Sequence, residues 1–454
     1  MAKKNDEYKE TSRFIIILCV IGILTFFIIG YLFYNEMRLK KTYMEHPYNP
    51  DQTIPRIYGG EIVTEDGKKV SWAKDKGDFE SNREYCGDID RFKQIIKSES
   101  FGIERGYRSK MVGMDEHYFY GTEKAGETIH LTVSNKLQTK AAELIESRWP
   151  NHEAAVVAMD PKTGAILCAY SHAEPGKGDP NKNSAMIVSK EDYGYAPGST
   201  MKTFWAAVSL EEGLELTDFN ARGSYAGVGN SVTPPATVNV EQALKYSVNK
   251  YFAYLAEQKL GEELMRKYAK KVFIGVPLQI DGIDTASYAK FTKDDGVVDL
   301  PRIGIGQGDM GVSALHMAMI SSVIANDGTL MKPYIVAKRT RYNGDVAYEH
   351  EPEVQEEIFS KESTDRVKNG MISVVNESGG TGTKARIPGI TVAGKTGTAE
   401  VAGGNSTRFI GFAPAENPKI AIAVFLEKTG SSGGEAAAPI ASELMRYWLT
   451  ECNP

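Results

Sequence analysis

The sequence predicts an α+β fold in which an antiparallel sheet is flanked by helices and carries a helical subdomain. Strand-like apolar runs occur at 154–171 and at 390–426, whereas the stretch between them, roughly 190–380, is mostly helical in pattern. Strands at both ends of a helical stretch imply an antiparallel sheet backed by terminal helices. A separate uncharged run at 14–33 predicts a membrane helix ahead of this domain.

The N-terminal part of the chain divides into an anchor and a small polar region. The uncharged run of about twenty residues is long enough to cross a bilayer, and no small-residue cleavage pattern follows it. We therefore expect an uncleaved signal anchor at 14–34, with residues 1–13 on the cytoplasmic side. Residues 35–128 are rich in turn signals and form a small N-terminal pedestal region, and residues 129–454 form the main domain.

Local patterns place the helices and strands of the main domain. Ser134 is suited to cap a helix, whose apolar stripe comprises Leu137, Ala141, Leu144, Ile145 and Trp149. A hairpin follows at 154–171, and further strands are expected at 390–400, 408–413 and 419–426. Two more helices are expected, at 88–97 and 439–449.

Composition restricts the classes of function. A chain of 454 residues suggests two or three domains, and a formal net charge of −6 argues against nucleic acid as a partner. Cys19 lies in the apolar run, and the other three cysteines are too scattered for a disulfide framework. Cys168 and His172 are spaced to share one face of a strand as metal ligands, but a buried apolar cysteine is the expected reading, with no metal.

The first chemical motif is Ser199 followed three residues later by Lys202. If Ser199 begins a helix, this spacing places Lys202 one turn further on the same face. A serine hydroxyl is a poor nucleophile until a base takes its proton. Apolar neighbours and the positive end of the helix both lower the pKa of a lysine. The pair therefore predicts a nucleophile with a neutral amine as its base, and the helix N-terminus supplies N–H groups for an oxyanion.

Two further motifs follow in order along the chain. Ser247 and Asn249 come after a helical stretch, 241–246, and offer a hydroxyl for proton relay and an amide for substrate recognition. Lys395 and Gly397 lie in a strand-like run, and alternation sends them to one face. The lysine offers positive charge to a substrate carboxylate, while the glycine leaves room for a ligand backbone.

The histidines offer no competing base. None of the seven lies in the three motifs, and no G-x-S-x-G nucleophile elbow is present. The three motifs in order, S-x-x-K, S-x-N and K-T-G, are typical of serine acyl-transfer enzymes that use lysine in place of histidine. This chemistry uses side chains and backbone groups alone, so no cofactor is expected.

The sequence resembles the class B penicillin-binding proteins, the membrane-anchored D,D-transpeptidases of bacterial cell walls. The resemblance covers roughly 129–450, and its segments besides the three motifs are 131–138, 154–171 with its D-P-K-T-G turn, 195–199, 304–308, 394–400 and 409–414. It implies a penicillin-binding, serine β-lactamase-like transpeptidase domain. One departure is visible at 405–408, where Asn-Ser-Thr-Arg stands just ahead of a strand that the family often precedes with an aromatic residue.

The resemblance also implies roles for individual residues. Ser199 would be the acylated nucleophile and Lys202 its base. Ser247 would relay protons, supported by Lys395, and Asn249 would hold the substrate amide. Substrate binding would fall to Thr396, Gly397 and Thr398, with both threonines on the substrate carboxylate. The backbone N–H groups of Ser199 and Thr398 would form the oxyanion hole.

The leading functional hypothesis is a peptidoglycan D,D-transpeptidase that is acylated by D-Ala-D-Ala stem peptides and by β-lactam antibiotics. One alternative is a hydrolase, either a D,D-carboxypeptidase or a β-lactamase. No Glu-to-Asn segment of the class A β-lactamase kind is found between Asn249 and Lys395, and class D enzymes usually carry an aliphatic residue in place of Asn249. Another alternative is a catalytically idle scaffold of the wall-building machinery.

The same resemblance implies location and partner. Basic residues stand on both sides of the apolar run, so charge does not decide its orientation. The cell-wall substrate places the catalytic domain outside the cytoplasm of a bacterium, on a single-pass anchor. A membrane-embedded glycosyltransferase is the expected partner, because the region 35–128 is too small to hold a glycosyltransferase domain.

Overall fold

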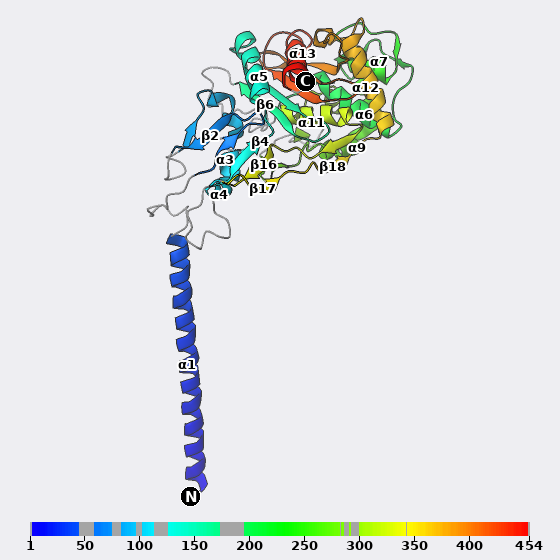
Figure 1. Cartoon of the computed structure of the whole chain (residues 1–454). Coiled ribbons are helices and arrows are strands. Elements are labelled where there is room, and N and C mark those ends of the chain that lie inside the picture. The colour runs from blue at the N-terminus through cyan, green and yellow to red at the C-terminus, as the bar shows by residue number, and fades with distance from the viewer. Residues whose placement is uncertain are drawn as a thin grey trace.

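The computed structural model describes residues 2–44, 59–74, 83–96, 102–112, 126–172, 195–281, 283–285, 290–291, 299–341 and 343–452. One long helix, α1 (Ala2–Met44), extends away from a body that contains all the other elements (Figure 1). Its segment Ile15–Arg38 is long and apolar enough to cross a membrane and is not buried against the body. The prediction of one N-terminal apolar helix is therefore confirmed.

The central sheet has five antiparallel strands in the order β19-β20-β21-β5-β6. Its strands are β5 (Ala154–Met159), β6 (Ile166–His172), β19 (Ala393–Val401), β20 (Gly404–Ala413) and β21 (Ile420–Leu426). Strands from both ends of the main domain thus meet in one sheet, as the sequence predicts. The order also leaves β19, which carries the K-T-G motif, at an edge of the sheet.

Helices cover both faces of this sheet. On one face lie α5 (Asn135–Arg148) and α13 (Ala437–Tyr447), which share a core with alternate strand residues such as Val156. On the other face lies α11 (Ala314–Ala325), which shares a core with the intervening residues such as Val157. Burial on both faces explains why β5, β21 and most of β6 are continuous apolar runs.

The middle of the chain forms a helical subdomain. Its helices are α6 (Lys202–Glu211), α7 (Val240–Lys245), α8 (Asn249–Leu255), α9 (Gly261–Lys271), α10 (Leu300–Gly304), α11 and α12 (Lys361–Asn376). Short strand pairs, not foreseen from sequence, lie among them: β7 (Phe219–Asn220) with β10 (Thr237–Val238), β8 (Ser224–Tyr225) with β9 (Val228–Gly229), β11 (Leu278–Ile280) with β12 (Ile283–Thr285), β13 (Lys290–Phe291) with β14 (Met310–Gly311), and β15 (Thr329–Met331) with β18 (Val354–Glu357). The predicted helical character of this stretch is confirmed.

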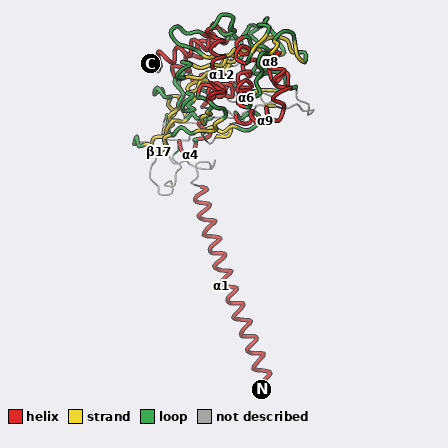
Figure 2. Tube along the Cα trace, turned by 90° about the vertical axis from the view of Figure 1, so that its right-hand side faces the viewer, coloured by secondary structure: helices red, strands yellow, loops and turns green. Residues whose placement is uncertain are grey.

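The N-terminal region contributes to a second sheet, in the order β17-β16-β4-β1-β2-β3. Its strands are β1 (Ile62–Val63), β2 (Lys69–Ala73), β3 (Arg83–Tyr85), β4 (Thr128–Leu131), β16 (Val336–Thr340) and β17 (Val346–Glu349). Because β16 and β17 come from the main domain, the two parts of the chain share backbone hydrogen bonds. Both views place β17 and α4 (Arg108–Met111) on the side of the body toward α1 (Figures 1 and 2).

Short helices complete the N-terminal region. They are a 3₁₀ turn at Ile89–Arg91, α2 (Lys93–Ile96) and α3 (Ile103–Gly106), besides α4. The first two occupy the stretch 88–97, where the sequence predicts a helix.

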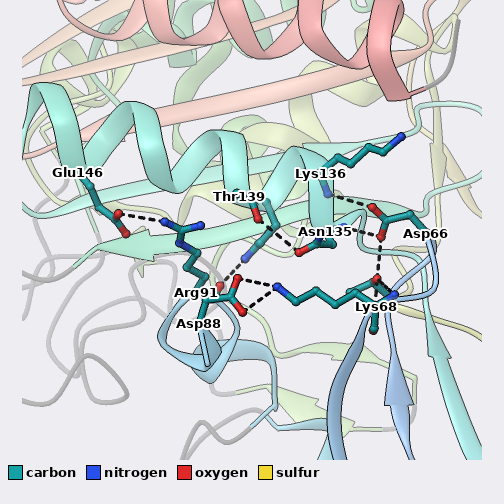
Figure 3. Close-up of polar contacts among 10 residues, drawn as sticks. Asp66, Lys68, Asp88, Arg91, Asn135, Lys136, Thr139 and Glu146 are labelled. Atoms are coloured by element: carbon teal, nitrogen blue, oxygen red, sulfur yellow. Dashed lines mark hydrogen bonds and ion pairs between the residues drawn. The ribbon is translucent and has the colours of Figure 1, made fainter. Parts of the chain in front are cut away.

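Polar contacts attach the N-terminal region to the start of α5 (Figure 3). The Ser134 side chain accepts from the backbone N–H of Leu137, so the predicted cap is confirmed. The Asp66 carboxylate accepts from the backbone N–H groups of Asn135 at 2.9 Å and of Lys136 at 3.1 Å. A carboxylate at a helix N-terminus satisfies free donors and interacts favourably with the helix dipole.

We expect Asp66→Ala to lower the free energy of unfolding by about 1 kcal/mol, because it removes two cap hydrogen bonds and the charge at the start of α5. Urea denaturation of the detergent-solubilised chain measures this. The control is Asp90→Ala, which removes an exposed carboxylate paired with Lys93 and is expected to change stability little. Equal losses for the two variants would contradict the capping role of Asp66.

Candidate functional site

The turn that carries Ser199 is confined by two neighbouring backbone segments. Ser199 lies in a 3₁₀ turn, Gly198–Met201, that runs directly into α6, so the prediction that it begins a helix is confirmed. The N–H of Gly198 donates to the carbonyl of Gly306 at 2.8 Å. A Cβ on Gly306 would lie 2.0 Å from the carbonyl oxygen of Gly198, and a Cβ on Gly198 would lie 2.9 Å from that of Thr398. Glycine at both positions, each with positive φ, is what permits this close packing.

Lys202 is fully buried at the start of α6. Its Nζ donates to the carbonyl oxygen of Ser247 at 2.9 Å, to its Oγ at 3.2 Å, and to Oδ1 of Asn249. Burial lowers the pKa of this amine well below its ordinary value, and the nearby charge of Lys395 lowers it further. The direction agrees with the sequence prediction, as does burial among apolar neighbours as the main cause, and the second cause is Lys395 in place of the helix terminus.

Ser247 and Asn249 sit at the junction between α7 and α8. Ser247 adopts a positive φ of 55°, which turns the chain between the two helices, and Asn249 is the first residue of α8. The Asn249 Nδ2 donates to the carbonyl of Gly229 in β9 at 2.8 Å. Asn249 therefore joins Lys202 on one side to the β8–β9 hairpin on the other.

Lys395 approaches Ser247 from the edge strand β19. Its Nζ donates to Ser247 Oγ at 2.9 Å and to the carbonyl of Thr396 at 3.0 Å. Its side chain is fully buried, and burial lowers its pKa from 10.5 to about 7. Among the residues that the structure describes, no carboxylate lies within ion-pair distance of Lys395 or Lys202. The two amines share one hydroxyl and would repel each other if both were charged. The state in which both are protonated is therefore disfavoured.

The remaining K-T-G residues face different partners. The Thr396 and Thr381 hydroxyls are hydrogen-bonded at 2.7 Å, and Thr398 Oγ1 accepts from the N–H of Gly433 at 3.2 Å. A Cβ on Gly397 would lie 3.0 Å from the carbonyl oxygen of Pro197. The missing side chain thus lets β19 pack against the Ser199 turn, and ligand contact at Gly397 remains a prediction.

A cleft of about 1390 Å³ opens beside these residues. Five of the eight predicted site residues line it, namely Ser199, Ser247, Asn249, Thr396 and Thr398. The two lysines do not line the cleft but lie buried behind its serine residues. Other lining residues include Tyr246, Arg302, Gln307, Asp309 and Glu400. The arrangement combines an accessible serine hydroxyl with buried amines that favour the neutral form, as nucleophilic acyl transfer requires.

Two lining residues that hydrogen-bond the K-T-G threonines were missed by sequence reasoning. Thr381 follows two glycines after α12, and Gly433 lies in a Ser-Ser-Gly-Gly turn after β21. Such clusters of small residues next to the ends of regular elements are the available signal, because they permit close approach of a backbone.

The Cys168 and His172 side chains, spaced in sequence as metal ligands, have different surroundings in the structure. Cys168 is fully buried, while the His172 ring nitrogens contact the Tyr170 hydroxyl at 3.3 Å and the Pro150 carbonyl at 3.0 Å. Within the described part of the chain, no group of three or more histidine, cysteine, aspartate and glutamate side chains is placed to hold a metal ion.

Comparison with known families agrees with this geometry. Residues 154–446 match the family described as the penicillin binding protein transpeptidase domain. The chain belongs to this family. The resemblance to class B penicillin-binding proteins and the predicted fold class are thereby confirmed.

Curated members of the family are similar over most of this chain. Stage V sporulation protein D of Bacillus subtilis is 29% identical over 369 residues, which are 74% of this chain and 56% of that protein. Peptidoglycan D,D-transpeptidase PbpA of Mycolicibacterium smegmatis is 27% identical over 404 residues, which are 78% of this chain and 80% of that protein. The chain spans only a little over half the length of the first of these relatives.

Solved structures of the family share the fold. The D,D-transpeptidase domain of a peptidoglycan glycosyltransferase from Eggerthella lenta is 28% identical, with a TM-score of 0.70 over 87% of this chain and 100% of that one. The ceftriaxone acyl-enzyme of penicillin-binding protein A from Mycobacterium tuberculosis is 23% identical, with a TM-score of 0.73 over 86% of this chain and 98% of that one.

We expect Lys395→Met to flatten the pH dependence of stability. The pKa of Lys395 is about 7 in the folded chain and about 10.4 in an unfolded one. Between these values the unfolded chain binds a proton that the folded chain does not, so the free energy of unfolding rises with pH by roughly 1 kcal/mol per unit. Urea denaturation across this window measures the slope. The exposed Lys69→Met is the control, and equal slopes in both variants would argue against a largely neutral Lys395.

Proposed function

We propose that this chain is a membrane-anchored peptidoglycan D,D-transpeptidase that forms a serine acyl-enzyme from D-Ala-D-Ala stem peptides. The observation that carries the proposal is the convergence of two buried lysines, Lys202 and Lys395, on the Ser247 hydroxyl beside the accessible Ser199. Relatives named peptidoglycan D,D-transpeptidase and β-lactam acyl-enzyme structures of the same fold support it.

Acylation begins when Ser199 Oγ attacks the carbonyl of the penultimate D-alanine. Neutral Lys202 takes the hydroxyl proton as the new C–O bond forms, so it ends the step as an ammonium. The negative charge on the carbonyl oxygen is stabilised by the backbone N–H groups of Ser199 and Thr398, whose segments pack together through Gly198.

Collapse of this intermediate breaks the C–N bond and needs a proton on the leaving amine. Ser247 Oγ is within hydrogen-bond distance of both lysines, so it passes its own proton to the amine and recovers one from Lys202. The substrate carboxylate binds Thr396 and Thr398, which both line the cleft, while Lys395 donates to the Ser247 hydroxyl. Asn249 Nδ2 has two N–H groups, so one can donate to the carbonyl of the substrate amide while the other keeps its bond to the Gly229 carbonyl.

The acyl-enzyme is then resolved by an amine from a neighbouring stem peptide. Nitrogen attacks the ester carbonyl, loses its proton through the same relay, and expels Ser199 as its hydroxyl. A hydrolase would need an activated water instead. Of the described residues, no carboxylate contacts Lys202, Ser247 or Lys395, and this favours transfer to an amine over hydrolysis.

The anchor supports a location at a bacterial cell membrane, with a single span and the catalytic domain outside. The apolar segment Ile15–Arg38 is not buried against the body, so its surface is available to lipid and to other membrane helices. A membrane-embedded glycosyltransferase that delivers new glycan strands is the partner we propose for this surface.

Ser199→Ala is expected to abolish covalent labelling by fluorescent penicillin. Lys202→Met should slow acylation by about 10²–10⁴-fold, because general-base assistance is lost while an apolar chain of similar length fills the buried space. In-gel fluorescence and intact mass spectrometry of the detergent-solubilised chain measure both. Ser231→Ala, which changes another serine lining the cleft, should label normally, and a labelled Ser199→Ala would refute the assignment.

The penicilloyl adduct is expected to persist for hours, because among the described residues no carboxylate contacts Lys202, Ser247 or Lys395 to activate water against the ester. Mass spectrometry over time measures the decay after excess penicillin is removed. A serine β-lactamase treated in parallel serves as the control and should show no lasting adduct. Rapid release of hydrolysed penicillin with many turnovers would favour the hydrolase alternative.

A further inference from the structure

Arg408 is a fully buried cation that joins three segments around the Ser199 turn. It lies on β20 directly opposite Gly397 of the K-T-G motif. Its Nε donates to the carbonyl of Ala196 at 3.2 Å, three residues before Ser199. Its Nη1 donates to the carbonyls of Thr407 at 3.0 Å and Leu426 at 3.1 Å. One guanidinium therefore connects the nucleophile turn to strands β20 and β21.

The charge of Arg408 is neutralised within the core. Its Nη2 pairs with the Glu427 carboxylate, which also accepts from the Ser406 hydroxyl at 2.7 Å. The Phe425 ring stacks against the guanidinium, with the ring centroid 4.4 Å from Cζ. A buried charge is tolerated only when it is paired and hydrogen-bonded, and these contacts meet that condition.

A second buried contact reaches the residue next to Ala196. The Tyr195 hydroxyl donates to the Glu153 carboxylate, and burial together with this carboxylate raises the pKa of Tyr195. The backbone N–H of Glu427 donates to the Glu153 carbonyl at 2.8 Å. The segment that leads into Ser199 is thus held on one side by Arg408 and on the other by Glu153.

We propose that Arg408 is a positioning residue for the nucleophile: it fixes the Ala196 carbonyl and thereby the position of Ser199 Oγ relative to β19. This inference rests on the proposed function, because it concerns the rate of acylation at Ser199. It also gives a role to the departure at 405–408, because phenylalanine or tyrosine has no side-chain N–H, whereas Arg408 donates one to the Ala196 carbonyl. Misplacement of a reacting atom by about 1 Å costs on the order of 10²-fold in rate.

Arg408→Met tests the proposal by removing every donor while keeping an apolar stem. We expect the first-order acylation rate constant for fluorescent penicillin to fall at least tenfold, with the dissociation constant of the reversible complex almost unchanged. Stopped-flow fluorescence of the detergent-solubilised chain separates the two quantities. An unchanged rate constant in a folded Arg408→Met chain would overturn the proposal.

Arg408→Lys tests it where the methionine variant does not fold. A lysine retains the charge and the pair with Glu427, but its compact ammonium cannot also hold the Ala196 carbonyl in the geometry of a guanidinium. We expect a folded chain whose acylation rate constant is again reduced at least tenfold. Full activity in this variant would show that charge alone suffices and would overturn the positioning role.

The chain provides a matched control in Arg83. Its side chain is 1% exposed, compared with 0% for Arg408, and like Arg408 it pairs with a glutamate. That glutamate is Glu104, and the Arg83 guanidinium also donates to the Ser71 hydroxyl. Arg83 and Ser71 lie on strands β3 and β2 of the second sheet and Glu104 lies on α3, and none of the three lines the cleft. We expect Arg83→Met to lower thermal stability without changing the acylation rate constant.

The outcomes separate this inference from the proposed function. If Arg83→Met slows acylation as much as Arg408→Met, general destabilisation explains the effect and the positioning role is refuted. If wild-type chain is labelled at Ser199 and all arginine variants match it, the inference fails while the function stands. If wild-type chain takes no label, the proposed function fails and this inference fails with it.

Discussion

The structure depends on one arrangement, the burial of two lysine amines against the single hydroxyl of Ser247. Burial without a counter-ion stabilises the neutral form of each amine and so makes a base available near neutral pH. It also requires three distant parts of the chain to meet: the start of α6, the α7–α8 junction and the edge strand β19. The five-stranded sheet, packed on both faces, fixes β19, and the helical subdomain fixes the other two.

Much of the fold could be predicted, because its central elements follow simple patterns. The strands β5 and β21 are apolar along their whole length, and Ser134 stands where a helix cap is needed. The strands β16 and β17 were not foreseen. They are short and mostly outside the core, so their sequence has no periodic signal. Pairing with β4, at the start of the main domain, joins them to strand β1 of the N-terminal region and so completes the second sheet.

The candidate site likewise contains one part that the sequence predicts and another part that it does not. Ser199 and Lys202 lie within one helical turn, so a local spacing was enough to predict their relation. The contact between Lys395 and Ser247 spans 148 positions, and the sequence motif identifies the residues without giving the distance. Thr381 and Arg408 belong to no motif used in the prediction. Their roles arise from packing between segments far apart in the chain, which a single sequence does not encode in any readable pattern.

Two sets of buried basic side chains lie near Ser199, and they differ in whether an acidic side chain pairs with them. Lys202 and Lys395 have no acidic partner among the described residues, so their pKa values are lowered and their protons can move. Arg408 is paired with Glu427 and bonded to three carbonyls, so its charge is held in place. A group that must exchange protons is best left without a counter-ion, whereas a group that must hold a backbone in position is best fully paired. The nucleophile therefore lies between an environment that sets protonation and one that sets geometry.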